Sequence, residues 1–262
     1  MFYGPLNHSG MRYLLATILL FAATLLVAQR VGLSLRSGIT AVQLHDPQLS
    51  PRLLSGSSML TGLAFAKISE ERWQQLQLSY ASAWLHSPVS HTFAAGSNTN
   101  RFHLGQFTQR ELWAVHRRET LALYGGFLGH ATIAYRRHHY LAGISEDQFE
   151  GAIGFGPAAG GLWHWRPGLQ LQAHLGWALF NYVASKDYSP RYFQREMLSR
   201  WSNFRGPGQY TLLQLGGGAE QRLSSRLSLA LHYQLQYYEY LHVQQLQHSV
   251  LLGGVLKLGK HE

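Results

Sequence analysis

Cysteine is absent from this sequence, and charged residues are scarce. Without cysteine the protein has no disulfide bond, no thiolate metal ligand, no cysteine nucleophile and no lipid-modified cysteine. Asp, Glu, Lys and Arg make up 13% of the chain, whereas soluble domains average about 25%. The several runs of about 20 apolar residues that a helical multi-span membrane protein needs are also missing. Aromatic residues reach 13%, which argues against a disordered chain.

The first part of the sequence has the pattern of an export signal. An apolar run at 14–28 follows Arg12 and ends on Ala28, as in secretory signal peptides. We therefore predict that residues 1–28 are a signal peptide and that residues 29–262 form one exported domain. Met11 is an alternative start, and an uncleaved membrane anchor is the alternative interpretation. For an exported domain, the net charge of +9 does not indicate a nucleic-acid partner.

Three stretches of the remaining chain alternate with the period of a β-strand. Residues 72–87, 168–183 and 227–238 place Leu, Tyr and Trp on one face, and mainly Gln, Ser, Ala, Gly or His on the other. Strands of soluble proteins usually run about 5–6 residues and often place charged side chains on the wet face. Long strands with an apolar outer face and an uncharged inner face are typical of a transmembrane β-barrel.

The expected connections alternate between short and long. Short turns fall near 69–72, 116–119, 166–168 and 223–226, and long loops near 45–57, 86–101, 136–150 and 185–208, with a shorter one near 242–246. Bacterial outer-membrane barrels have short periplasmic turns, long extracellular loops and an even number of strands. Counting from 31–44 to 247–259 gives about ten antiparallel strands. Residues 102–115 place large side chains on both faces, which a bulge would reconcile, and eight strands remain the alternative.

On this pattern the chain resembles the broad class of small bacterial outer-membrane β-barrel proteins, over roughly residues 31–259. The resemblance implies an all-β fold, an antiparallel up-and-down transmembrane barrel, contact with outer-membrane lipid and insertion by the barrel assembly machinery. One feature departs from the class, whose last strand usually ends on an aromatic residue: residues 255–262 contain none. A soluble periplasmic β-sandwich or a lipocalin-like barrel is the alternative fold.

The inward faces of the predicted strands carry polar side chains that should converge in the lumen. These are Gln170, Gln172, His174, Gln214, Glu220, Arg222, His232, Gln234 and Gln236. A barrel of this size has little room beyond its own side chains, and buried polar groups need partners. We therefore predict a hydrogen-bonded plug in which Glu220 pairs with a cation such as Arg222. A narrow conducting pore is the alternative.

The predicted loop 185–208 contains a helical pattern. Ser189-Pro190 suits the start of a helix and Gly206-Pro207 suits its end. Between them, basic and large apolar residues alternate: Arg191, Phe193, Arg195, Met197, Arg200, Trp201, Phe204 and Arg205. We therefore predict a short helix at about 190–205 in an extracellular loop. It would fold over the mouth as a lid, contact anionic headgroups such as lipopolysaccharide phosphates, or dock a surface-complex partner.

The sequence predicts neither a nucleotide-binding site nor an aspartate-based protease site. Residues 154–159 match a dinucleotide fingerprint, but no helix can be read after them, so their glycines are expected to relieve crowding in a strand. The ten-stranded proteases of the outer-membrane class use Asp–Asp and Asp–His pairs. Here Asp46, Asp147 and Asp187 lie far apart in the sequence. No catalytic residue and no cofactor is predicted.

Histidine occurs 15 times, so catalytic and metal sites need a direct test. The sequence His130-Ala131-Thr132 is the closest to the His-x-Ser arrangement of outer-membrane lipid hydrolases, but it faces the interior in this register. His138-His139 lies in a predicted loop with acidic residues, yet adjacent histidines on a strand point apart. We therefore predict a solvated, charge-mixed loop there and no metal site.

These observations together predict a non-enzymatic protein of the bacterial outer membrane with a structural, binding or narrow-transport role. An outer-membrane enzyme that modifies lipid or peptide, and an accessory barrel of a secretion or surface complex, remain the alternatives.

Overall fold

A computed structural model describes residues 31–45, 53–86, 99–139, 145–185, 202–240 and 243–258. The strands are β1 (Val31–His45), β2 (Leu54–Ile68), β3 (Arg72–His86), β4 (Thr99–Arg117), β5 (Leu121–His139), β6 (Ser145–Arg166), β7 (Leu169–Ala178), β8 (Phe180–Ser185), β9 (Ser202–Arg205), β10 (Tyr210–Arg222), β11 (Leu227–Tyr240) and β12 (Val243–Leu258). The predicted signal peptide, residues 1–28, lies outside the described residues.

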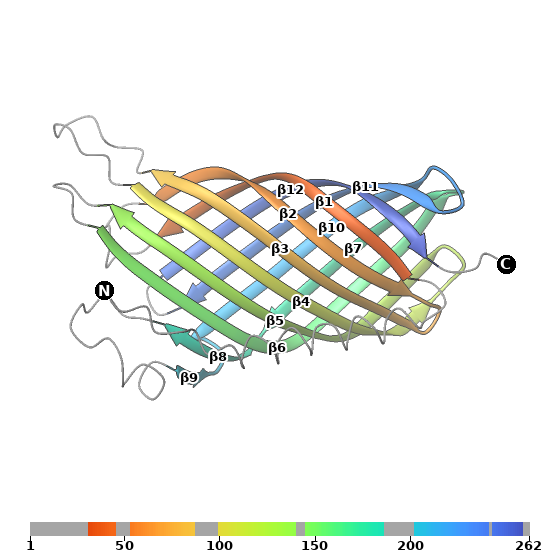
Figure 1. Cartoon of the computed structure of the whole chain (residues 1–262). Helices are drawn as coiled ribbons and strands as arrows, with labels where there is room; N and C mark the ends of the chain where they lie inside the picture. The colour runs from red at the N-terminus through yellow and green to blue at the C-terminus, as the bar shows by residue number, and fades with distance from the viewer. Residues whose placement is uncertain are drawn as a thin grey trace.

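The strands form one closed antiparallel barrel (Figure 1). Sequential neighbours pair around the wall, β1 closes onto β12, and the β7–β6 and β6–β5 pairings complete the circle. Strands β7 and β8 are two halves of one strand interrupted at Leu179, and β9 and β10 pair with β8 and β7 respectively. The twelve segments therefore make ten barrel strands, which confirms the predicted count.

Along the barrel strands, apolar side chains that face outward alternate with side chains that face the lumen, as the sequence predicts. On β3, Leu78 and Trp84 are exposed on the outside, while Gln77 and Ser79 are buried inside. The outside is apolar because it faces lipid, and the inside need only fill a narrow lumen. The outer-membrane barrel predicted from this period is therefore confirmed.

Strand β4 has a register shift at the end of the range 102–115, where its two faces suggested a bulge. Phe102 and Leu112 both face inward and are fully buried, and Trp113 faces outward. The irregularity of this strand lies between Ala114 and His116, close to the turn. Both faces carry large residues because the lumen itself is apolar at its two ends, so a bulge within 102–112 is not needed.

The predicted helix at about 190–205 is wrong at its C-terminal end. Residues 202–205 form strand β9, which pairs with Asn181–Ala184 of β8. The edge of β8 offers backbone hydrogen bonds to this segment, and an extended chain satisfies them. Residues 186–201, with the rest of the predicted helix, lie outside the described residues. Among the residues that are described, no helix is long and apolar enough to cross a membrane.

Candidate functional site

A polar layer crosses the middle of the lumen. Arg110 on β4 donates hydrogen bonds from Nη2 to Gln214 Oε1 at 2.9 Å and from Nη1 to Gln75 Oε1 at 3.3 Å. Gln77 on β3 donates to Gln234 on β11 at 3.4 Å. Gln75 is the cross-strand neighbour of Arg110. The bonds from Arg110 to Gln214 and from Gln77 to Gln234 instead join strands that are not adjacent in the wall, and so they cross the lumen.

Most of the predicted lumen residues of β7, β10 and β11 belong to this layer or border it, and Arg222 does not. Gln172 shares a hydrogen bond with Nδ1 of His232 at 3.1 Å. The ring of His174 lies against Gly216, where an added Cβ would come within 2.2 Å of its Nε2 atom. Gln236 is buried higher in the lumen, in a small pocket beside Glu150.

Glu220 has a cation partner, as predicted, but the partner is Lys257 and not Arg222. Glu220 pairs with Lys257 on β12, with 3.1 Å between Oε1 and Nζ. Arg222 is exposed at the end of β10, and its Nε donates to the backbone oxygen of Ser224 in the following turn at 3.2 Å. At the open end of the barrel, the guanidinium reaches water and the turn more readily than the lumen, so it lies outside the polar network.

A vestibule of about 880 Å³ opens below the polar layer, at the end of the barrel that carries the short turns. Its inner wall includes Gln170, Glu220 and Lys257, and its rim includes Glu70 and Arg117. Arg117 lies 2.8 Å from Glu70, and its hydrogen bond lowers the pKa of that carboxyl group. The vestibule is polar at its rim and partly apolar on its wall.

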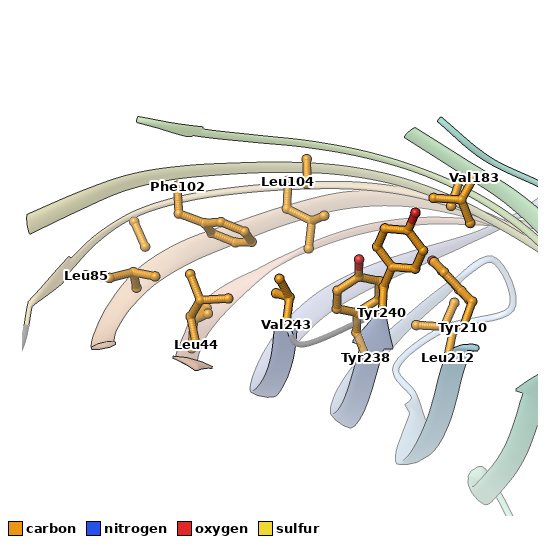
Figure 2. Close-up of a cluster of buried hydrophobic side chains, with 14 of the residues drawn as sticks. Leu44, Leu85, Phe102, Leu104, Val183, Tyr210, Leu212, Tyr238, Tyr240 and Val243 are labelled. Atoms are coloured by element: carbon orange, nitrogen blue, oxygen red, sulfur yellow. The ribbon is translucent and has the colours of Figure 1, made fainter. Parts of the chain in front are cut away.

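An apolar layer of buried side chains lies in the lumen at the opposite end of the barrel, where the long loops are (Figure 2). It takes buried residues from every one of the ten barrel strands: Val42, Leu44, Leu54, Ala83, Leu85, Phe102, Leu104, Ala134, Ala152, Ala178, Val183, Tyr210, Leu212, Tyr238, Tyr240 and Val243. The labelled side chains point into the space that the strands enclose (Figure 2). We call this set the mouth layer.

The mouth layer was not predicted from the sequence. An uncharged polar face was expected for the whole interior, because the middle of each clear strand shows that face. The mouth layer could have been predicted from the strand ends. There, alternate inward positions such as Val42 and Leu44, or Tyr238 and Tyr240, are apolar.

A buried charged cluster lies among the residues of the mouth layer. Arg136 and Glu150 are both almost fully buried, with 3.8 Å between Nη2 and Oε2. Tyr238 donates a hydrogen bond to Glu150 from across the barrel, and Arg136 donates to Gln148 Oε1 at 3.0 Å. The acid neutralises the base in a region that excludes water, as buried ions require.

The predicted charged loop at 136–150 is shorter than expected, because β5 extends to His139 and β6 begins at Ser145. On the outside, Arg137 donates two hydrogen bonds to Asp147, at 2.7 and 3.0 Å. His138 points inward and lies 3.3 Å from the side-chain nitrogen of Asn100. Within the described residues, no group of three His, Cys, Asp or Glu side chains is placed to hold a metal ion.

His130 faces the interior, as its register predicts. Its Nε2 lies 2.8 Å from the amide oxygen of Asn181, and its ring stacks on Tyr210. The glycines of 154–159 lie within strand β6. A Cβ on Gly156 would come within 2.0 Å of the backbone oxygen of Trp177, so the glycine permits close packing of the two strands, and β6 continues to Arg166 without a helix.

The outer surface has the height of a membrane. On β4, outward-facing Trp113 and Arg101 are twelve residues apart, which is about 40 Å along a strand. At a tilt of about 45° this gives about 28 Å along the membrane normal, close to the apolar band of outer-membrane barrels. Large apolar residues such as Leu78, Phe127 and Ile133 are exposed between these levels.

Comparison with known proteins gives a fold and no family. No known protein family and no curated protein matches the chain. The outer membrane protease OmpT from Escherichia coli matches at a TM-score of 0.51 and 7% identity, over 87% of this chain and 96% of that chain. The fold is that of a bacterial outer-membrane β-barrel. At this level of identity the likeness shows the fold alone.

Two other similar structures have lower TM-scores. The translocator domain of the autotransporter NalP from Neisseria meningitidis matches at 0.42 and 12% identity, over 96% of each chain. Ail, the attachment invasion locus protein of Yersinia pestis, matches at 0.39 and 10% identity, over 87% of this chain and 99% of that chain. The closed hydrogen-bonded wall and the exposed apolar band independently place the protein in the outer membrane.

Proposed function

We propose that the protein is a closed, non-enzymatic barrel of the outer membrane with a binding or structural role rather than a conducting one. The observation that carries this proposal is the mouth layer, to which every barrel strand contributes a buried apolar side chain. Ions do not cross a dry layer of this kind without first opening it, because a charge in an apolar medium loses its hydration. The cross-lumen bonds of Arg110 form a second barrier below it.

Conductance in a planar lipid bilayer tests this proposal. The purified protein, shown to be folded by its mobility shift between unboiled and boiled samples, is added to one side of the bilayer. We expect no regular current steps, under conditions in which a general porin gives them. Reproducible steps from the folded protein would overturn the proposal and favour narrow transport.

A second role is favoured by the outer surface at the long-loop end. Arg101 and Arg137 are direct cross-strand neighbours there, and the guanidinium of Arg101 lies 5.6 Å from the ring centre of Trp84. Like charges directly opposite each other repel; Asp147 neutralises Arg137, which leaves one net positive charge, that of Arg101, for an anion at this surface. We infer that this surface contacts lipid phosphates, lipopolysaccharide included, at the level of the headgroups. The arginines of the loop 185–208 would extend the same surface.

Lipopolysaccharide that remains with the purified protein measures this contact. We expect the double variant Arg101→Gln with Arg137→Gln to retain less lipopolysaccharide than the wild type. Arg222→Gln together with Arg226→Gln, at the other end of the barrel, is the matched control and should retain as much as the wild type. Equal retention by both double variants would contradict the inference.

Export is part of the same proposal. A signal peptide at 1–28 would deliver the chain to the barrel assembly machinery of the outer membrane. Sequencing the N-terminus of the membrane form should then show Gln29 as the first residue, whereas a start at Met1 or Met11 would indicate that the segment remains attached.

A further inference from the structure

Two arginines lie buried in the middle of the lumen. The side chains of Arg36 on β1 and Arg110 on β4 are 8% and 1% exposed, and the two guanidinium groups repel each other. Arg36 donates from Nε to Ser34 Oγ at 2.9 Å. Arg110 uses its two terminal nitrogens on glutamines, and its Nε has no partner among the described residues. The hydrogen bonds of both cations described here therefore go to neutral groups.

Two histidines face the same charges. His174 interacts electrostatically with Arg36, Arg110 and His232, and His232 interacts with Arg36. Both ring nitrogens of His174 and Nε2 of His232 are buried and have no hydrogen-bond partner within the described part of the chain. The layer thus combines two guanidinium groups with nitrogens that can donate further hydrogen bonds.

Among the described residues, carboxylate groups do not fully balance this charge. Glu220 attracts Arg36, but Glu220 already forms an ion pair with Lys257. Glu150 is paired with Arg136 in a separate cluster, among the residues of the mouth layer. Two positive charges remain in a region where an uncompensated ion is costly, and a buried ion is normally neutralised by an opposite charge.

We propose that the polar layer binds a small inorganic anion, with chloride as the simplest member of the class, between Arg36 and Arg110. The anion neutralises the two guanidinium groups and accepts hydrogen bonds from them, while His232 and His174 border it. Charge-assisted bonds of this type are roughly twice as strong as neutral ones. The site does not depend on whether the barrel conducts, since an anion held this tightly would complete a plug or narrow a pore.

The vestibule provides the route to this site. Its inner wall includes Gln170, and Gln172 is the next inward residue along β7, already bonded to His232. The vestibule therefore brings an ion from the short-turn side close to the polar layer. Side chains cross the lumen at this layer, so we expect a small ion to bind there and a large organic anion such as gluconate not to bind.

Thermal unfolding at constant ionic strength tests the proposal. Chloride replaces gluconate stepwise, and the loss of the compact gel mobility is followed with temperature. We expect the midpoint to rise and then saturate, by about 5–10 °C when chloride reaches about a hundred times its dissociation constant. An unchanged midpoint in the wild-type protein would overturn the proposal.

Paired variants separate a specific site from a general salt effect. Arg110→Met removes one buried charge at similar volume and should abolish the saturable chloride dependence. Arg222→Met removes an exposed arginine and should keep it. The same chloride dependence in both variants would overturn the proposal.

A crystal soaked in bromide gives a readout that does not require Arg110→Met to fold. An anomalous bromide peak between Arg36 and Arg110 supports the site, and density there without anomalous signal, as water would give, overturns it.

Discussion

The indole of Trp73 on β3 lies against the backbone of Gly160 on β6, so closely that a Cβ at position 160 would come within 2.6 Å of the ring. Trp73 is 1% exposed and packs edge-on against Tyr124 at 5.8 Å between ring centres. Together with Leu112 and Leu162 these residues form an apolar cluster above the vestibule. The glycine is therefore a packing requirement of the largest side chain in the lumen.

This contact predicts the effect of two substitutions. Gly160→Val should destabilise the barrel by about 1–3 kcal/mol, because the added side chain has no space beside the indole. Trp73→Ala should cost about 3–5 kcal/mol through the cavity it leaves. The urea midpoint of the gel-mobility shift measures both. The double variant Gly160→Val with Trp73→Leu should lose less stability than the sum of the losses of its two single variants, because the smaller leucine leaves space for the valine side chain. If the two losses simply added, residues 73 and 160 would not be in contact.

Removing the acid of the buried cluster should be far more damaging than removing an exposed one. Glu150→Leu leaves Arg136 buried without its carboxylate, which costs about 3–5 kcal/mol for pairs of this kind. Asp147→Asn weakens the exposed Arg137 pair and should change the same unfolding midpoint little, because water screens that pair. If the two variants were equally stable, the cluster would not be dry.

A charge on the lipid-facing wall should be tolerated according to its depth. Leu252 on β12 is exposed in the middle of the apolar band, and Leu223 is exposed in a short turn. Leu252→Lys should cost about 2–4 kcal/mol and Leu223→Lys about 0–1 kcal/mol, measured by urea unfolding in lipid vesicles. Equal costs at the two positions would contradict the placement of the membrane.

The pair at the vestibule rim predicts a response to acid. The pKa of Glu70 is lowered below its usual value of 4.5 by the hydrogen bond from Arg117. A lowered pKa contributes stability above about pH 4.5, and this contribution is lost as the pH falls through the lower value in the folded protein. Glu70→Gln should therefore differ from wild type at about pH 7 and converge with it at about pH 3.

The effect at Glu70 should be small, because both partners are exposed to water. Glu71→Gln, in the same turn, is the matched control in the same unfolding measurement. A difference between Glu70→Gln and wild type that grows as the pH falls would have the wrong sign and would exclude the ion pair as its source.

The period-two alternation of the strands and the alternation of short turns with long loops could be predicted, because each depends only on residues that are close together in the sequence. Lipid on one side and a narrow lumen on the other impose a period of two, and this period identified β3, β7 and β11 with their inward glutamines. The partner of Glu220 could not be predicted in the same way. Arg222 is its neighbour in sequence and on the strand, but Lys257 lies on β12, two strands away along the wall.

The sequence alone therefore determined the wall of this protein: its strands, their outward faces and the membrane they match. Only the tertiary structure decided what meets inside. Closing ten tilted strands brings Arg110 to Gln214, 104 residues away, and Tyr238 to Glu150, 88 residues away. Local alternation carries no information on such pairs, because the stagger of the whole barrel sets which inward positions share a level.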